Sequence, residues 1–502
     1  MLPGMPDGAV HHRTALQIVA DVAAGRSSAR AAVDAALERA AKVQTDTNAF
    51  THLLTERART AADALDARLH AERAAGRPAP PLAGVPFVAK ANLCVEGVPT
   101  SAASNILADF HPPYDATVIA RLEAAGAVLI AMGNMDEFGM GSSSEHSAHG
   151  PVRHPLDPDR VAGGSSGGPA VAVTTGVVPI ALGTDTGGSV RQPAAFCGVL
   201  GFKPTYGTLS RHGVIAYASS LDQVGVLARD AGDVAAVLDA LVGRDRYDAT
   251  TLELPGGYRV GLEAPGGAGL DRLRVGVIGE LVGEGNHPAV QDATEETIRR
   301  LRELGAEVSE VEVPDARAGV ACYYLIASAE ASSNLARYDG MITGVRVGEE
   351  IDGQEAVMTA SRGAGFGTEV RRRVLMGTFA LSAGHVDAWY GRALQVRRKV
   401  SNQLSDAFAS HDLLLSPTVP TPAFRQGERT NDPLAMYLGD VDTCLANLAG
   451  IGAISVPAGR DQAGLPVGVQ FLAPALHDGR LLRVAQALAG LDGRRGHAAG
   501  AG

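Results

Sequence analysis

The sequence predicts an α/β protein with a single large domain, in which a mixed, largely parallel β-sheet is covered by helices on both sides. Short apolar runs bounded by Gly, Asn or Pro alternate with longer segments that carry apolar residues at three- and four-residue spacing. This alternation implies strands joined by helices. Hydrophobic residues make up 46% of the 502 residues and charged residues 20%, a balance that allows a large buried core. We expect one domain over residues 10–490.

The first part of that domain is expected to be helical. Residues 13–76 are rich in Ala, Leu, Arg and Glu at helical spacing. The pattern changes at residue 82, where LAGVPFVAK (82–90) and AGAVLIAMGN (125–134) are typical of buried strands. The segment ATVIARLEAAG (116–126) between them has helical spacing. We expect this strand–helix–strand order within a core of residues 80–240.

The second half of the chain repeats this order. Its expected elements are the strand LRVGVIG (273–279), the helix PAVQDATEETIRRLRELG (288–305), and the strands AEVSEVEVP (306–314), HDLLLSP (411–417) and ISVPAG (454–459). We assign residues 270–490 to the same domain. The segment GRRGHAAGAG (493–502) is expected to be a flexible tail.

Charge and cysteine content exclude several classes of protein. The net charge is −11 and no basic run is longer than residues 371–373, so a nucleic-acid partner is expected to bind another subunit. The four cysteines are far apart and form no C-x-x-C pair, which argues against structural disulfides and zinc. The N-terminus has no signal-peptide core, and the uncharged run 161–184 is too rich in glycine for a membrane span. We expect a cytoplasmic protein without a metal site.

Two glycine-rich segments offer a candidate nucleophile. The first, AGGSSGGPA (162–170), matches the G-x-S-x-G pattern of α/β-hydrolases with Ser166 at its centre. That fold needs an acid and then a histidine downstream, and no downstream histidine is a persuasive partner. The second, LGTDTGGSVRQP (182–193), follows a short apolar strand. Glycines in such a turn let backbone N–H groups converge on an oxyanion, and Ser189 ends this turn.

A lysine provides a base that does not depend on histidine. Lys90 interrupts an apolar strand, where a charge is costly unless it has a use. Burial favours the neutral amine, so Lys90 could accept a proton in a Ser–Lys system. Alternatively, Lys90 is a structural residue whose amine reaches solvent at the end of the strand.

The segments around Lys90, Ser165 and Ser189 together resemble the amidase signature family. The resemblance implies that Ser189 is the acyl-forming nucleophile, Ser165 the proton relay and Lys90 the final base. It also implies a cis peptide between Gly164 and Ser165. Ser166 then becomes a structural neighbour in the loop.

The resemblance also assigns the oxyanion donors. They would be the backbone N–H groups of Thr186, Gly187, Gly188 and Ser189. The loss of one such donor typically costs about 100- to 1,000-fold in rate.

Within that family, the chain resembles the A subunits of tRNA-dependent amidotransferases over residues 10–490. The similarity lies in NMDEFGMGSSSE, SLDQVGVLARD, ASAEASSNLARYDG, FGTEVRRRVLMGTFALSAG and DPLAMYLGDVDTCLANLAG. These subunits hydrolyse glutamine to ammonia. The resemblance implies that Arg373 binds the α-carboxylate, that Asp440 binds the α-ammonium, and that Tyr324 and Met140 line the pocket.

Each of these four residues also has a structural interpretation. Arg373 could lie on a solvated helix face, and its role could belong to one of the two arginines that precede it. Asp440 could cap a turn, while Tyr324 and Met140 could be core residues.

The resemblance also implies partners. A second subunit (B) would hold ATP and Mg²⁺, bind the tRNA and convert Glu-tRNA(Gln), Asp-tRNA(Asn) or both, and a small third subunit (C) would complete a heterotrimer. This chain would need no cofactor, and it has no G-x-x-x-x-G-K-[ST] loop. The competing hypotheses are a stand-alone amidase that cleaves small-molecule or aryl amides, and a catalytically silent scaffold.

Overall fold

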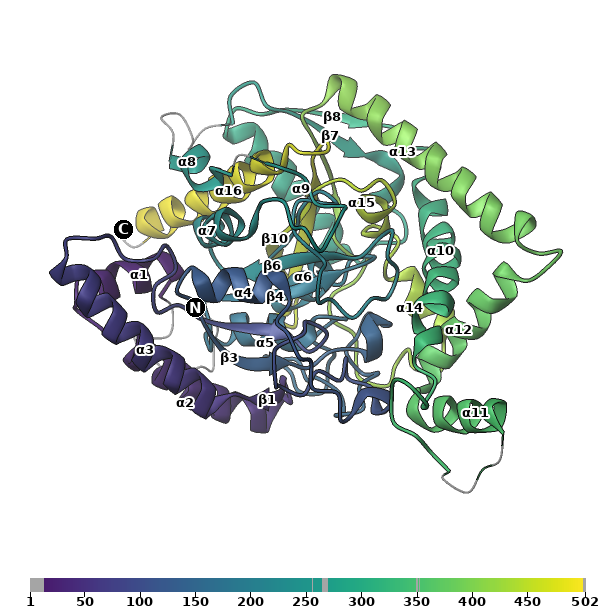
Figure 1. Ribbon diagram of the computed structural model, residues 1–502. Helices are drawn as coiled ribbons and strands as arrows, with labels where there is room; N and C mark the ends of the chain where they lie inside the picture. The colour runs from purple at the N-terminus through teal and green to yellow at the C-terminus, as the bar shows by residue number, and fades with distance from the viewer. Residues whose placement is uncertain (1–12, 255, 264–269, 349–350, 352, 500–502) are drawn as a thin grey trace.

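One β-sheet passes through the whole molecule. The computed structural model describes residues 13–254, 256–263, 270–348, 351 and 353–499. The sheet has the strand order β1-β3-β2-β4-β6-β5-β10-β11-β9-β7-β8, and helices cover both of its faces (Figure 1). The strands are β1 (Phe50–Leu53), β2 (Pro86–Lys90), β3 (Val128–Gly133), β4 (Ile180–Asp185), β5 (Leu200–Lys203), β6 (Gln223–Ala228), β7 (Arg274–Ile278), β8 (Glu307–Val311), β9 (Leu413–Pro417), β10 (Ala453–Arg460) and β11 (Pro466–Leu472).

The predicted mixed α/β sheet is confirmed, and its parallel pairs form two separate groups. Strands β3, β2 and β4 are parallel to one another, as are β9, β7 and β8. Every neighbouring pair between β4 and β9 is antiparallel, so the sheet is less parallel than the sequence predicts. Connections without a crossover helix explain the difference: β10 and β11, for example, are joined by a short turn over residues 461–465, which only antiparallel strands can use.

The predicted N-terminal helical segment contains three helices and one strand. The helices are α1 (Ala15–Ala23), α2 (Ala29–Thr47) and α3 (Thr55–Ala74). Thr14 and Gln17 form a capping box at the start of α1, and the Ser28 hydroxyl accepts from a backbone N–H of α2. Strand β1, which pairs with β3 at the sheet edge, was not predicted because its four residues lie between two long helical patterns.

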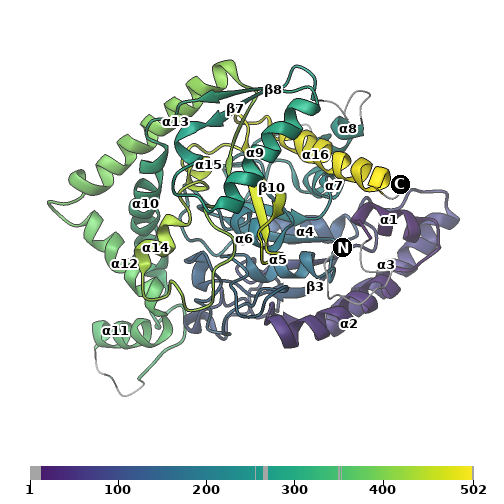
Figure 2. The same cartoon turned by 180° about the vertical axis from the view of Figure 1, so that it is seen from behind.

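The remaining helices build the rest of both layers. They are α4 (Thr117–Ala124), α5 (Gly167–Thr174), α6 (Arg191–Cys197), α7 (Ala231–Leu241), α8 (Tyr258–Glu263), α9 (Pro288–Glu303), α10 (Gly319–Asn334), α11 (Gln354–Gly365), α12 (Thr368–Leu381), α13 (Arg392–Ser410), α14 (Pro433–Leu438), α15 (Cys444–Leu448) and α16 (Asp478–Ala499). Helices α10, α12 and α13 lie on the side of the molecule opposite to α1–α3 (Figures 1 and 2).

Helix α16 includes most of the segment that the sequence predicts as a flexible tail, because it continues to Ala499. Residues 10–12 of the predicted domain and 500–502 of the tail lie outside the described residues. The assignment of residues 80–240 to the catalytic core and of residues 270–490 to the remainder of the same domain stays a prediction.

Burial in the centre of the core explains why residues 161–184 carry no charged side chain. Every residue of α5 and of β4 is buried, so both elements contact protein on all sides. A charged side chain at such positions would need a partner inside the core. None of the described helices is long and apolar enough to span a bilayer.

Candidate active site

Three segments meet at one edge of the sheet. Strand β2 ends at Lys90, and its parallel neighbour β4 ends at Asp185, just before the turn that contains Ser189. Parallel neighbours have their carboxyl ends at the same edge, so Lys90 and this turn lie close together. Ser165 lies two residues before the start of α5, which contacts both strands.

Lys90 is fully buried and in contact with Ser165. Its Nζ atom lies 2.7 Å from Ser165 Oγ, 3.0 Å from Thr184 Oγ1 and 3.2 Å from the Thr184 carbonyl oxygen. Burial lowers the pKa of Lys90 to about 7, although the carboxylates of Asp136, Asp185 and Asp222 favour the charged form. A neutral amine can donate two hydrogen bonds to Thr184 and accept one from the Ser165 hydroxyl group.

Ser165 and Ser166 have different surroundings. The Gly164–Ser165 peptide is cis, as the family resemblance implies. Ser166 N donates to the carbonyl oxygen of Ser189 over 3.1 Å, and the Ser166 hydroxyl donates to the Thr184 carbonyl over 3.3 Å. Ser166 therefore connects the first glycine-rich loop to the second.

Ser189 is 7% exposed, whereas Lys90 and Ser165 are fully buried. The backbone of Ser189 is held by Ser166 N. Among the described residues, no hydrogen bond joins the hydroxyl groups of Ser165 and Ser189. The structure thus joins Lys90 and Ser165 through their side chains, and it joins Ser189 through the backbone to Ser166, the residue after Ser165.

The turn before Ser189 needs its two glycines. A Cβ atom on Gly187 would lie 2.4 Å from Tyr323 Cζ, and one on Gly188, whose φ is +133°, would lie 2.3 Å from Thr443 Oγ1. Gly188 N donates to Asp185 Oδ1 over 2.9 Å. One of the four predicted oxyanion donors is therefore already engaged, which leaves the amides of Thr186, Gly187 and Ser189.

A buried ion pair supports this turn, and the sequence did not identify it. Arg191 contacts both carboxylate oxygens of Asp185, at 3.0 and 3.1 Å, and both side chains are fully buried. Arg191 also donates to Gln470 Oε1 over 2.8 Å and to Asn447 Oδ1 over 2.7 Å. Burial opposes the charge on Asp185, but Arg191 outweighs it and lowers the pKa of Asp185 to about 2.

Asp440 lies in a second cluster of polar side chains. It accepts a 2.6 Å hydrogen bond from the Tyr324 hydroxyl, and both of its oxygens accept from the Ser142 hydroxyl at 2.8 and 2.9 Å. Asp440 is 6% exposed, and burial raises its pKa to about 6. At neutral pH this carboxyl group is therefore mostly ionised.

Arg373 faces the same cluster from α12. Its guanidinium carbon lies 4.9 Å from the centre of the Tyr324 ring. Its Nε atom donates to Glu369 over 2.8 Å and its Nη1 atom donates to the Tyr217 hydroxyl over 2.8 Å. Arg373 is 2% exposed, so it does not lie on a solvated helix face.

The two arginines before Arg373 are more exposed than Arg373 itself. Arg371 is exposed, and the half-buried Arg372 forms an ion pair with Glu369. Met140 is fully buried in the same apolar cluster as Tyr324. All four residues that the sequence predicts for substrate binding are therefore buried in one region.

Gln192 connects this region to the catalytic loops. Its Oε1 atom accepts from Gly164 N over 2.8 Å, and its Nε2 atom donates to the carbonyl oxygen of Ser142 over 2.7 Å. Thr443, which follows Asp440 by three residues, donates to the Gly187 carbonyl over 2.6 Å. Gln192 and Ser142 both lie in segments that the sequence singles out, but nothing in their spacing marks them.

Comparisons with known proteins identify the family of this chain. A model of the family Amidase matches residues 31–482. The chain is 50% identical over 480 residues to the A subunit of the glutamyl-tRNA(Gln) amidotransferase of Deinococcus radiodurans, covering 95% of this chain and 96% of the relative. It is also 50% identical over 472 residues to the protein of the same name from Thermus thermophilus, covering 94% and 95%.

Solved structures give the same family. The crystal structure of the A subunit of the glutamyl-tRNA(Gln) amidotransferase from Thermotoga maritima matches with a TM-score of 0.76 at 36% identity, covering 97% of this chain and 96% of that one. The peptide amidase of Stenotrophomonas maltophilia matches with a TM-score of 0.81 at 30% identity, covering 95% and 96%. The predicted family is confirmed: the chain belongs to the amidase family.

Proposed function

We propose that this protein is the glutamine-hydrolysing A subunit of a tRNA-dependent amidotransferase. The observation that carries the proposal is the buried contact between Lys90 Nζ and Ser165 Oγ, and it is supported by the buried cluster around Tyr324 that contains Arg373 and Asp440. The names of the relatives that are 50% identical to the chain support the choice of glutamine.

The proposed reaction begins with proton transfer. The lone pair of neutral Lys90 takes the Ser165 hydroxyl proton as Ser165 Oγ takes the proton of Ser189, and Ser189 Oγ attacks the side-chain carbonyl carbon of glutamine. The Ser165–Ser189 hydrogen bond would form when substrate binds, since catalytic hydrogen bonds often tighten only in the complex. The carbonyl oxygen becomes an oxyanion, which accepts from the amides of Thr186, Gly187 and Ser189.

The oxyanion then collapses and breaks the carbon–nitrogen bond. The proton on Lys90 returns through Ser165 to the leaving nitrogen, and ammonia departs. The product left behind is an ester between Ser189 and the glutamate side chain. Water, deprotonated along the same route, hydrolyses this ester and releases glutamate.

Arg373 and Asp440 would fix the two charged groups of free glutamine. Nε and one hydrogen of Nη1 are used by Glu369 and Tyr217, so donors on both Nη1 and Nη2 remain for the α-carboxylate. The ionised Asp440 carboxylate would pair with the α-ammonium group. A small amide that lacks these groups would make neither contact.

We extend the proposal to partners and location. The relatives are named as the A subunit of an amidotransferase. A B subunit would hold ATP and Mg²⁺, bind tRNA and use the ammonia, and a small C subunit would complete a cytoplasmic heterotrimer. This chain would supply only ammonia and would need no cofactor of its own.

The decisive experiment compares two substrates in one variant. In the complex with its partners, Arg373→Met is expected to raise KM for glutamine by about 10- to 100-fold, because a charge-assisted bidentate contact is lost. Its kcat/KM for a short neutral amide should change little. Arg371→Met, at an exposed position on the same helix, is the matched control. Equal losses on both substrates, or faster hydrolysis of an aryl amide than of glutamine by the wild-type protein, would favour a stand-alone amidase.

A further inference from the structure

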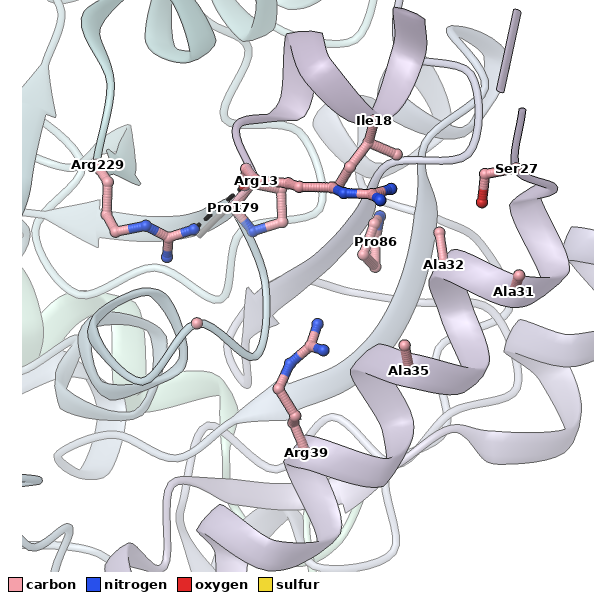
Figure 3. Close-up of a pocket in the computed structure, with 11 residues that line it drawn as sticks. Arg13, Ile18, Ser27, Ala31, Ala32, Ala35, Arg39, Pro86, Pro179 and Arg229 are labelled. Atoms are coloured by element: carbon pink, nitrogen blue, oxygen red, sulfur yellow. Dashed lines mark hydrogen bonds between the residues drawn. The ribbon is translucent and has the colours of Figure 1, made fainter. Parts of the chain in front are cut away.

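A pocket lies away from the candidate active site, between the N-terminal helices and the sheet. It has a volume of about 200 Å³ and is shown in Figure 3. Arg13 precedes α1, Arg39 belongs to α2 and Arg229 follows β6, and all three side chains line this pocket. The rest of its wall is small or apolar, including Ile18 and Pro179.

The pocket lies at the ends of the catalytic elements that are remote from the chemistry. Pro86, which lines it, begins β2, and Lys90 ends that strand. Gly176 and Pro179 lie between α5 and β4, whose other ends lead to the two serine loops. A five-residue strand spans about 16 Å, so the pocket and the candidate active site are separate.

Two of the three arginines have no carboxylate partner among the described residues. Arg13 pairs with Asp21 at 3.1 Å. Within the described part of the chain, the hydrogen bonds of Arg39 and Arg229 go only to backbone carbonyl oxygens, such as Val177 O at 3.4 Å from Arg39 and Arg13 O at 3.3 Å from Arg229. Arg39 Nε is buried without a hydrogen-bond partner. An unsatisfied, charged donor of this kind is costly in a protein that binds nothing there.

The two guanidinium groups also destabilise each other. Burial and the nearby charge of Arg229 lower the pKa of Arg39, and the charge of Glu38 only partly opposes this shift. Burial lowers the pKa of Arg229, and the charge of Asp233 only partly opposes that shift. Asp233 is the acid whose charge acts on Arg229. Its carboxylate oxygens accept hydrogen bonds from the backbone N–H groups of Ala15 and Leu16. The pocket therefore contains about two positive charges that the described residues do not neutralise by direct contact.

We infer that this pocket binds a dianionic phosphate group, either as inorganic phosphate or as the end of a small phosphorylated metabolite. A phosphate monoester carries about −1.5 to −2 charges at neutral pH, which balances Arg39 and Arg229. Its oxygens accept hydrogen bonds from guanidinium groups in the geometry that arginine favours. The apolar wall around Ile18 and Pro179 leaves room beside the phosphate for a short carbon chain.

Isothermal titration of the full-length protein tests the inference directly. Inorganic phosphate and glycerol 3-phosphate are titrated at constant ionic strength, with sodium chloride as the reference. We expect saturable binding of phosphate to the wild-type protein and at least about 10-fold weaker binding to Arg39→Met, because that residue supplies a charged contact. The exposed Arg77 is the control, and Arg77→Met should bind phosphate as the wild type does. Tighter binding of the monoester would identify a metabolite as the ligand, and equal binding would identify inorganic phosphate.

A second variant distinguishes the loss of phosphate binding from a defect in folding. Ala35 lines the pocket one helical turn before Arg39 on α2, so Ala35→Glu would place a carboxylate next to Arg39. We expect this variant to melt at or above the wild-type temperature and to lose phosphate binding. The inference is overturned if the wild-type protein gives no phosphate signal above sodium chloride, or if Arg39→Met and Ala35→Glu bind phosphate as tightly as the wild type.

Discussion

The pH dependence of hydrolysis gives the sharpest test of the proposed base. Burial lowers the pKa of Lys90 from its usual 10.5 to about 7. The base must be neutral to accept a proton, so kcat/KM should fall tenfold for each pH unit below about 7 and level off above it. At a pH of about 5.5 the rate should be about 30-fold below the plateau. A short neutral amide is the right substrate, because the titration of Asp440 then has no effect on binding.

One substitution assigns the acidic limb of this profile to Lys90. The Asp136 carboxylate favours the charged form of Lys90, so Asp136→Asn should move the midpoint of the limb to lower pH. Asp46 is exposed, and Asp46→Asn should leave the midpoint where it is. A rate that is constant from about pH 5.5 to about pH 8, or a midpoint that Asp136→Asn leaves unchanged or raises, would refute the proposal that a neutral lysine is the base.

Three further substitutions test the turn that contains Ser189. Gly187→Ala places a methyl group 2.4 Å from Tyr323 Cζ, and urea unfolding should show a loss of about 1–3 kcal/mol; an unchanged stability would contradict this contact. Arg191→Met leaves the buried Asp185 carboxylate without its partner and should cost about 3–5 kcal/mol, whereas the double variant with Asp185→Asn should lose less. Ser189→Ala should lower kcat by at least about 1,000-fold at an unchanged melting temperature, and retained activity would show that another residue is the nucleophile.

The local elements of the fold could be predicted from the sequence. The apolar runs at 82–90 and 125–134 contain β2 and β3, and the helical pattern at 116–126 contains α4. These elements are recognisable because both strands are entirely buried, which makes them continuous apolar segments. The composition and spacing of these segments predict the strands and the helix without any knowledge of long-range contacts.

The pairing of the strands and part of the site depend on contacts between distant residues. The antiparallel centre of the sheet follows from how strands such as β5 and β10 meet, which no local pattern encodes. Ser142 reaches Asp440 across 298 residues, and Arg191 reaches Gln470 across 279. Lys90 is recognisable in the sequence because it interrupts an apolar strand and because the family pattern includes it, whereas a supporting contact of this kind leaves no trace in spacing.

The hydrogen bond between Gln192 and Ser142 bears on how new specificities could arise on this framework. Gln192 donates a hydrogen bond to the main-chain carbonyl oxygen of Ser142, a group that every amino acid has. The contact with Asp440 depends instead on the hydroxyl group of Ser142. If Asp440 binds the substrate as proposed, exchange of that hydroxyl, or of the acid that it contacts, would alter which amides fit and would leave the Gln192 contact to Gly164 in place. The residues proposed to bind substrate could then change for other amides while the catalytic loops keep their supporting contacts.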